Sequence, residues 1–335
     1  MLAGKQLNEW LLDQPLDKFP GRGRPDYLEQ YKALEQYFNT DVHPHVMAAA
    51  AATDGSLLTD HGPEHIRTVI ARASSMLAHQ DPSQKLSPYE VYILLVAMHL
   101  HDVGNIFGRK EHEARLTDII RNVTGRMGDN TAELRLVRNI AEAHGGNIDG
   151  DKDTIGRLPA DEHIGDFPVR SPLLAAILRF SDEMTEDKTR ASIFLDRAGA
   201  IPAKNLLYHK YALSLYSVVV RKREIELKFE LNISAAKDKY SKNRKKVYLV
   251  DEIFSRTIKM HYERMYCMRH IRPLINIDVI NVKIEIFDED FMRPIDEISY
   301  KLEEKGYPVD GDINIDLWPN LKNWCGKKGK ILKRS

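Results

Sequence analysis

The sequence predicts a mainly α-helical protein with a smaller α+β domain appended after its helical part. From residue 46 to about residue 199, apolar residues recur every three or four positions, which is the spacing of amphipathic helices. After Pro202, apolar and polar residues alternate instead, which is typical of strands. A chain of 335 residues is also long enough to bury a core in each of two domains.

The first 203 residues are expected to fold mainly into helices. Residues 1–45 form a predicted N-terminal helical extension, in which PDYLEQYKALEQYFN places apolar residues at helical spacing. Residues 46–203 form the predicted helical domain, interrupted by GRMGDNT and by a longer polar insertion at residues 145–172. Long irregular loops inside compact domains are often functional, so the longer insertion is a candidate lid; a solvated surface loop is the alternative.

Residues 204–320 are expected to form the α+β domain. The stretches YALSLYSVVV and EIELKFELNI predict a β-hairpin joined by RKR, and the polar run SAAKDKYSKNRKK follows them. The remainder is predicted, in order, as the helix YLVDEIFSRTIKMHYERMYCMRH, the strand DVINVKIEIF, the helix RPIDEISYKLEEKG and the strand DINIDL. Residues 321–335 form a basic tail.

Composition limits the classes of function. No stretch of the sequence is long and apolar enough for a transmembrane helix, and the first residues lack the charge pattern of a signal peptide. We therefore expect a cytoplasmic protein without membrane attachment. The two cysteines, Cys267 and Cys325, have no CxxC partner and are expected to be reduced thiols.

The formal net charge of zero hides a separation of charge along the chain. Residues 1–203 carry 22 basic and 30 acidic side chains, whereas residues 204–246 carry 12 basic and 4 acidic ones. Residues 247–335 carry 15 of each kind. An acidic domain favours cations, and the basic segment that follows it favours the phosphate groups of a substrate or a nucleic acid.

Histidine and aspartate residues lie where apolar helical stripes begin or end. His65 precedes one such stripe, and His101, Asp102, His144 and Asp182 each follow one. Burying an unpaired carboxylate or imidazole is unfavourable, and one bound cation would stabilise all five. Mixed imidazole and carboxylate ligands favour manganese, nickel, iron or zinc over calcium. For any single residue, the alternative is a hydrogen-bonded core histidine or an aspartate paired with a nearby arginine.

The pattern H…HD…D in a helical chain resembles the HD superfamily of metal-dependent phosphohydrolases. The matching stretches run from about residue 61 to residue 187 and are DHGPEHIRTVIARA, AMHLHDVGN, GRKEHEARLTDII, AEAHGGN and ILRFSDEMTED. The resemblance implies a helical HD-domain core that binds one or two divalent transition metal ions. The implied ligands are His65, His101, Asp102 and Asp182, with His144 and His112 as candidate ligands of a second ion.

The resemblance also implies the chemistry of the site. Asp102, together with His101, would act in catalysis by positioning the water that attacks phosphorus. Candidates for binding the substrate phosphate are His61, Arg67, Arg109, Lys110 and Arg115, for which solvated surface charge is the alternative. The sequence lacks GxGxxG, GxxxxGKS/T, GxSxG and HExxH, so other nucleotide-binding or hydrolase motifs have no support.

Members of this superfamily act on nucleotides, cyclic dinucleotides, alarmone nucleotides and nucleic acids. The chain lacks the GYP signature of cyclic-di-GMP phosphodiesterases and the ED pair of alarmone hydrolases. A nucleotide or a nucleic acid therefore remains as the expected substrate. The basic runs RKR and KDKYSKNRKK favour a polyanion, with solvated loops as the alternative.

The stretch ILRFSDEMTEDKTRAS resembles HD domains of bacterial conflict systems that occur beside chaperone-type ATPases. This resemblance implies a role in antiviral defence and a protein partner of that kind. The alternative function is a non-catalytic HD module that binds a nucleotide or nucleic acid and regulates a partner. The complete H…HD…D set favours the enzyme, and the sequence does not indicate an oligomeric state.

Overall fold

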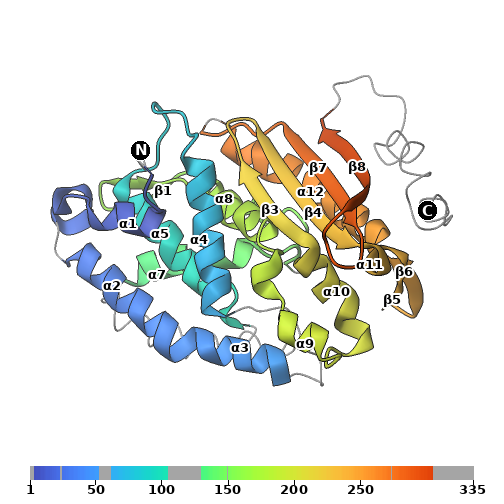
Figure 1. Ribbon diagram of the computed structural model, residues 1–335. Coiled ribbons are helices and arrows are strands. Elements are labelled where there is room, and N and C mark those ends of the chain that lie inside the picture. Colours follow the sequence, from blue (N-terminus) through green and yellow to red (C-terminus); the bar gives the residue numbers. More distant parts are fainter. Residues whose placement is uncertain are drawn as a thin grey trace. The chain divides into compact units, whose positions relative to one another are not determined.

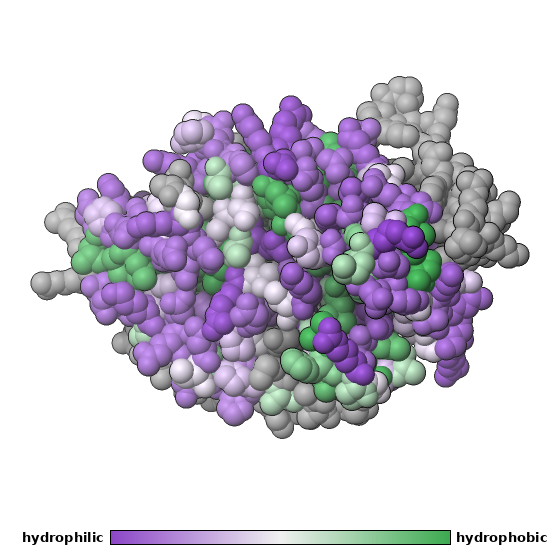
Figure 2. All heavy atoms as spheres, in the orientation of Figure 1, coloured by the Kyte–Doolittle hydropathy of each residue, from purple (hydrophilic) through white to green (hydrophobic). Residues whose placement is uncertain are grey.

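The computed structural model describes residues 4–22, 25–52, 62–104, 130–148, 150–272 and 274–304 (Figure 1). Helices predominate over strands, which confirms the prediction of a mainly α protein with some sheet. The chain divides into two compact units, and the domain boundaries expected from the sequence stay predictions. Among the described residues, the first unit holds those up to Thr185 and residues 267–276, and the second holds residues 186–266 and 277–304. The face drawn in Figure 2 is mostly hydrophilic.

The N-terminal part of the first unit is helical, as predicted. Its elements are α1 (Leu7–Leu12), the 3-10 turns η1 (Leu16–Lys18) and η2 (Pro20–Arg22), α2 (Tyr27–Tyr37), the π-helical turn η3 (Phe38–Val42) and α3 (His43–Ala52). The Asp26 carboxylate caps α2 by accepting hydrogen bonds from the backbone N–H groups of Leu28 and Glu29. On its apolar face α2 buries Tyr31 and Leu34, which anchors it to the helical core.

Four helices form the core of the first unit: α4 (Pro63–Leu77), α5 (Pro88–Leu100), α7 (Thr131–Ala143) and α8 (Ser171–Glu183). Ser87 and Glu90 form a capping box that begins α5, and Pro88 suits the first turn, where an N–H would have no helical partner. Every residue of α5 from Tyr89 to Leu100 is buried. Because α1, α2, α4, α7 and α8 all pack against α5, it is the central helix of this unit.

The insertion between α7 and α8 contains regular structure and is fastened to the core. A short antiparallel hairpin, β1 (Glu162–Ile164) with β2 (Phe167–Val169), lies in it. Near its start, the Thr154 hydroxyl donates to the Ala143 carbonyl oxygen at 2.7 Å, and Arg179 of α8 donates to that hydroxyl at 3.0 Å. Near its end, Arg170 pairs with the buried Glu90 through bonds of 2.7 and 2.8 Å. The role of this insertion as a lid stays a prediction.

The second unit is built on a four-stranded sheet. Its strands lie in the order β3 (Leu215–Val220), β4 (Glu224–Asn232), β7 (Val279–Phe287) and β8 (Pro294–Glu303). The central pair is parallel and the two outer pairs are antiparallel. Every second residue of β4 and β7 is buried, so one face of the sheet contributes the apolar core of this unit.

Helices and a second hairpin complete the second unit. They are η6 (Lys188–Arg190), α9 (Ile193–Arg197), α10 (Ala203–Ser214), α11 (Ile233–Lys237), β5 (Lys239–Lys242), β6 (Lys245–Tyr248) and α12 (Leu249–Ile271), whose last residues belong to the first unit. The strands β5 and β6 pair only with each other, as an antiparallel hairpin. They lie mostly in the run SAAKDKYSKNRKK, for which the sequence predicts no regular structure, and β6 ends at Tyr248, the first residue of the predicted helix.

The prediction of a helix for RPIDEISYKLEEKG is wrong, because residues 294–303 form strand β8. The spacing of Ile295, Ile298 and Leu302 suits a helix. In the structure, Ile298 pairs with Ile284 of β7 and Leu302 pairs with Ile280. This pairing stabilises the strand over the helix, because it buries the side chains of Ile298 and Leu302 and satisfies the backbone groups along β7.

The change from helix to sheet comes later than predicted. Helix α10 extends to Ser214, and β3 begins at Leu215, so the first residues of the predicted strand YALSLYSVVV are helical. From Leu215 onward the predicted hairpin with EIELKFELNI is confirmed. The predicted strand DINIDL lies outside the described residues.

Candidate metal site

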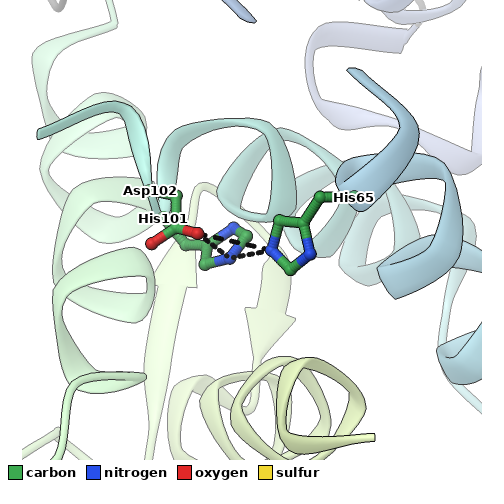
Figure 3. Close-up of side chains that lie close together, drawn as sticks. All are labelled: His65, His101 and Asp102. Atoms are coloured by element: carbon green, nitrogen blue, oxygen red, sulfur yellow. Dashed lines mark hydrogen bonds and ion pairs between the residues drawn. The ribbon is translucent and has the colours of Figure 1, made fainter. Parts of the chain in front are cut away.

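The ends of four helices bring five of the predicted site residues together. His65 lies in the first turn of α4, and Asp182 lies in the last turn of α8. His101 is the C-cap of α5 and is followed by Asp102, and His144 is the C-cap of α7. Figure 3 shows His65, His101 and Asp102 pointing toward one another. Because the carboxyl ends of helices carry partial negative charge, the convergence of three of them favours a cation.

The distances between ligand atoms fit a small divalent ion. Nε2 of His65 lies 3.3 Å from Asp102 Oδ2, 3.3 Å from Asp182 Oδ1 and 3.4 Å from His101 Nε2. Nε2 of His101 lies 3.4 Å from Asp102 Oδ2 and 3.7 Å from Asp182 Oδ1. A tetrahedral ion with bonds of about 2.1 Å holds its ligand atoms about 3.4 Å apart. The four side chains are thus spaced like the ligand set of one ion.

Two of the imidazole rings are oriented by backbone carbonyl groups. Nδ1 of His101 lies 2.7 Å from the Met98 carbonyl oxygen, and Nδ1 of His144 lies against that of Ala141. A carbonyl oxygen can only accept, so Nδ1 carries a proton in both rings. In the neutral ring, Nε2 then keeps a lone pair directed at the cluster. Metal-binding histidines generally have this arrangement.

The third imidazole, that of His65, is oriented by Thr185. Nδ1 of His65 lies 3.4 Å from the Thr185 hydroxyl oxygen, and the hydroxyl donates to the Asp182 main-chain carbonyl oxygen at 2.7 Å. Since the hydroxyl proton is used in that bond, its oxygen accepts from the Nδ1–H of His65. The Nε2 lone pair of His65 therefore also faces the cluster.

The pKa values show that the cluster favours an added positive charge. Burial lowers the pKa of His101, but the Asp102 and Asp182 carboxylates outweigh it and hold that pKa well above its ordinary value. Burial raises the pKa of Asp182, but the two histidines His101 and His65 outweigh it and hold that pKa well below its ordinary value. Ionised carboxylates that stabilise a proton on a buried imidazole provide the electrostatic environment that a metal ion requires.

His144 lies at the edge of the same cluster. Its Nε2 lies 4.0 Å from Asp102 Oδ1, and its ring lies 4.8 Å from that of His101 in an edge-on orientation. Burial, and then the nearby His101, lowers the pKa of His144, so the ring stays neutral and its Nε2 is a potential ligand. Among the described residues, two overlapping groups suit a metal: His65 with His101 and Asp102, and His101 with His144 and Asp182.

Of the remaining predicted site residues, the structure describes Arg67 alone, and Arg67 is not part of this cluster. Arg67 is exposed on α4 and pairs with Glu64 at 2.8 Å, and its role in binding phosphate stays a prediction. The other candidates lie outside the described residues; they are His61, Arg109, Lys110, His112 and Arg115.

Sequence reasoning missed the groups that orient the ligands. Thr185 is fully buried three residues after Asp182, and this spacing allows its hydroxyl to bond back to the preceding helical turn. The carbonyl groups of Met98 and Ala141 each lie three residues before a C-cap histidine. Since the last carbonyl groups of a helix lack intrahelical partners, a histidine at the C-cap is the signal that could have indicated both bonds.

Comparison with known families identifies the class of the protein. The family model HD-CE matches residues 55–259, which is more than half of the chain, so the chain belongs to the HD-CE family. This match and the histidine–aspartate cluster confirm the resemblance to HD-type proteins. No curated protein and no solved structure matches the chain. Within the described residues, no helix is both long and apolar enough to span a membrane.

Proposed function

We propose that the protein is an HD-type, metal-dependent phosphohydrolase that cleaves a phosphate ester of a nucleotide or nucleic acid. The observation that carries the proposal is the ligand set itself. Four side chains from the ends of the three helices α4, α5 and α8 converge. The Nε2 atoms of the two histidines lie 3.3 to 3.7 Å from each other and from the two carboxylates, and the outer ring nitrogens are engaged elsewhere. Family membership supports the same chemistry, because HD-type domains are generally metal-dependent hydrolases.

His65, His101, Asp102 and Asp182 would hold the ion. A divalent transition metal bound there lowers the pKa of bound water and polarises phosphoryl oxygen atoms. Asp102 presents Oδ2 to the two histidines, and its other oxygen, Oδ1, faces His144. That second oxygen would accept a proton from the attacking water or bind a second ion together with His144. We propose one or two ions of manganese, nickel, iron or zinc.

The pattern of exposure indicates the side from which a substrate arrives. The side chains of His65 and His101 are fully buried, whereas those of Asp182, His144 and Asp102 are 29%, 19% and 14% exposed. The two histidines therefore form the floor of the site. A phosphate ester would approach from the open side, between Asp182 and His144, where the carboxylates alone would repel it. A bound cation is needed to reverse that charge.

The proposal is tested by metal content and turnover together. The protein is purified, stripped with a chelator, and reloaded separately with manganese, nickel, iron and zinc. We expect one or two equivalents of metal by elemental analysis and metal-dependent hydrolysis of an activated phosphodiester such as bis(p-nitrophenyl) phosphate. The variant His101→Ala/Asp102→Ala should lose both, while His45→Ala, which removes an exposed imidazole on α3, should keep both.

Two outcomes would contradict the hydrolase. If the parent protein takes up none of the four metals, the proposal of a metal-dependent hydrolase is wrong. A parent protein that binds metal and nucleotides but hydrolyses none of a nucleotide and oligonucleotide panel would instead support the regulatory HD module. The chaperone-type ATPase partner and the defence role stay predictions.

A further inference from the structure

Two basic segments of the second unit differ in whether their charges are neutralised. In the β3–β4 turn RKR, Arg221 pairs with Glu226 through bonds of 2.9 and 3.0 Å. Arg223 in the same turn pairs with Asp278, with an Nε to Oδ2 distance of 2.6 Å. Carboxylates thus occupy the two guanidinium groups of this turn, and these two arginines offer little to a further anion.

The second basic segment, which we call the basic ribbon (Lys237–Tyr248), consists of the β5–β6 hairpin and the two residues before it. Its strands are antiparallel, with Lys239 opposite Tyr248 and Lys242 opposite Lys245. Its turn residues, Asn243 and Arg244, have φ angles of 48° and 62°, which are typical of the tight type I′ turn of a two-residue hairpin. Asparagine tolerates this conformation, so the ribbon has a defined backbone and is more than a solvated loop.

The two faces of the basic ribbon have different roles. On one face, Tyr240 is buried, and Lys242 forms an ion pair with the buried Glu252 of α12. This face fixes the ribbon to its own unit, where β5 also packs against α10. The register places the side chains of Lys239, Ser241, Lys246 and Tyr248 on the opposite face.

All cations of the basic ribbon except Lys242 lack acidic partners among the described residues. Across the part of the chain that the structure describes, no ion pair with an acidic residue involves Lys237, Lys239, Arg244, Lys245 or Lys246. The Lys239 ammonium lies over the Tyr248 ring, 5.0 Å from its centroid. The outer face therefore combines unpaired cations, one hydroxyl and one aromatic ring. None of the large exposed hydrophobic side chains lies on it, and the place of β5 and β6 in Figure 2 is coloured hydrophilic.

We propose that the basic ribbon binds the backbone of single-stranded nucleic acid. Unpaired lysines and an arginine release counterions when they neutralise successive phosphates. The Tyr248 ring beside Lys239 gives an unstacked base a surface on which to stack, which a duplex does not need. An anionic membrane fits less well, because a peripheral membrane site needs exposed apolar side chains beside its cations. The inference rests on the proposed function in that it names the nucleic acid, rather than the mononucleotide, as the ligand.

The test compares two double variants that remove the same charge. Binding of a fluorescein-labelled oligothymidylate of about 20 nucleotides, long enough for one site, is measured by anisotropy at several salt concentrations with chelator present. Lys245→Gln/Lys246→Gln removes two unpaired charges of the ribbon, and Arg221→Gln/Arg223→Gln removes the two paired charges of the turn. We expect the ribbon variant to bind about tenfold more weakly at low salt, with a salt slope smaller by about 1.4, while the turn variant stays near the parent.

A third variant separates stacking from charge. Tyr248→Leu should weaken binding of the oligothymidylate several-fold while leaving the salt slope unchanged, since the lost contact carries no charge. Equal weakening in both charge variants, or no change in either, would overturn the proposal. So would tighter binding to phosphatidylserine vesicles than to the oligonucleotide.

The failure of this inference can be told apart from failure of the hydrolase. Metal content and hydrolysis of bis(p-nitrophenyl) phosphate do not depend on the ribbon and should be unchanged in Lys245→Gln/Lys246→Gln. If these two measurements are positive and the oligonucleotide does not bind, the ribbon assignment is wrong and the phosphohydrolase stands. If the oligonucleotide binds through the ribbon but no metal is found, the phosphohydrolase proposal is wrong and the ribbon assignment stands.

Discussion

The hydroxyl oxygen of Thr185 lies 3.4 Å from Nδ1 of His65, and the hydroxyl donates to the carbonyl oxygen of Asp182 at 2.7 Å. Thr185 thereby sets the ring orientation of one proposed ligand and the position of the helical turn that carries another. It touches neither Nε2 nor the carboxylates through these bonds, so it acts as a positioning residue.

Thr185→Val keeps the shape of the side chain but removes its hydroxyl. We expect metal affinity to fall by about 10- to 100-fold, because the His65 ring loses the acceptor that fixes its tautomer. Affinity would be measured by competition with a chromophoric chelator. Thr185→Ser restores the hydroxyl and should recover most of the affinity, whereas a merely steric role for Thr185 predicts that Val is the better replacement.

Metal should also stabilise the fold. A ligand that binds only the folded state adds about 2.7 kcal/mol to the free energy of unfolding at one hundred times its dissociation constant. We therefore expect the melting temperature of the stripped protein to rise as manganese or zinc is added. His101→Ala/Asp102→Ala should melt at the same temperature with and without metal. An equal rise in both proteins would place the ion elsewhere.

Glu133 is predicted to make stability depend on pH. Burial raises its pKa to about 7 in the folded protein, against 4.5 ordinarily. The unfolded state thus loses its proton first, so the free energy of unfolding falls as the pH rises from 4.5 to 7, by about 3 kcal/mol. Below pH 4.5 both states are protonated and the contribution of Glu133 is flat.

Urea denaturation of Glu133→Gln across this pH range checks the prediction. The free energy of unfolding of the variant should increase relative to that of the parent as the pH rises, and the variant should be the more stable protein at pH 8. Glu29→Gln, at an exposed position of α2, should run parallel to the parent. If the free energy of unfolding of Glu133→Gln also changes with pH in the same way as that of the parent, the raised pKa of Glu133 is contradicted.

The pair formed by Glu90 and Arg170 should contribute more than a surface pair. Glu90 is buried and also completes the capping box of α5. Glu90→Ala is expected to lower the free energy of unfolding by about 3 kcal/mol, since it removes a cap and leaves Arg170 without its partner. Glu142→Ala breaks the exposed pair with Arg138 and should change it by less than about 1 kcal/mol. Similar losses in the two variants would show that burial of Glu90 is unimportant.

The candidate site was predictable because its signal is local. His101 and Asp102 stand at the end of an apolar run, and so do His144 and Asp182, so the anomaly can be read within one helix at a time. The orienting role of Thr185 was not predictable in this way. It depends on how close α4 comes to the end of α8, and this is set by packing between helices.

Strand β8 shows where local patterns do not suffice. The spacing of Ile295, Ile298 and Leu302 suits a helix, and pairing with β7 makes the segment a strand. The start of β3 is a similar case. Alternation in YALSLYSVVV extends back to Tyr211, but α10 continues to Ser214 because Tyr211 and Ala212 are buried on its inner face. In both cases tertiary contacts override the local preference.

The complete burial of α5 has a consequence for mutational scanning of this protein. A helix without an exposed side tolerates few substitutions anywhere, so His101 would not stand out from its neighbours in a tolerance profile. Helix α7 differs, because Arg135, Arg138 and Glu142 lie on a solvated side that accepts most replacements. Intolerance at His144, just beyond that helix, would therefore be informative where intolerance at His101 is not.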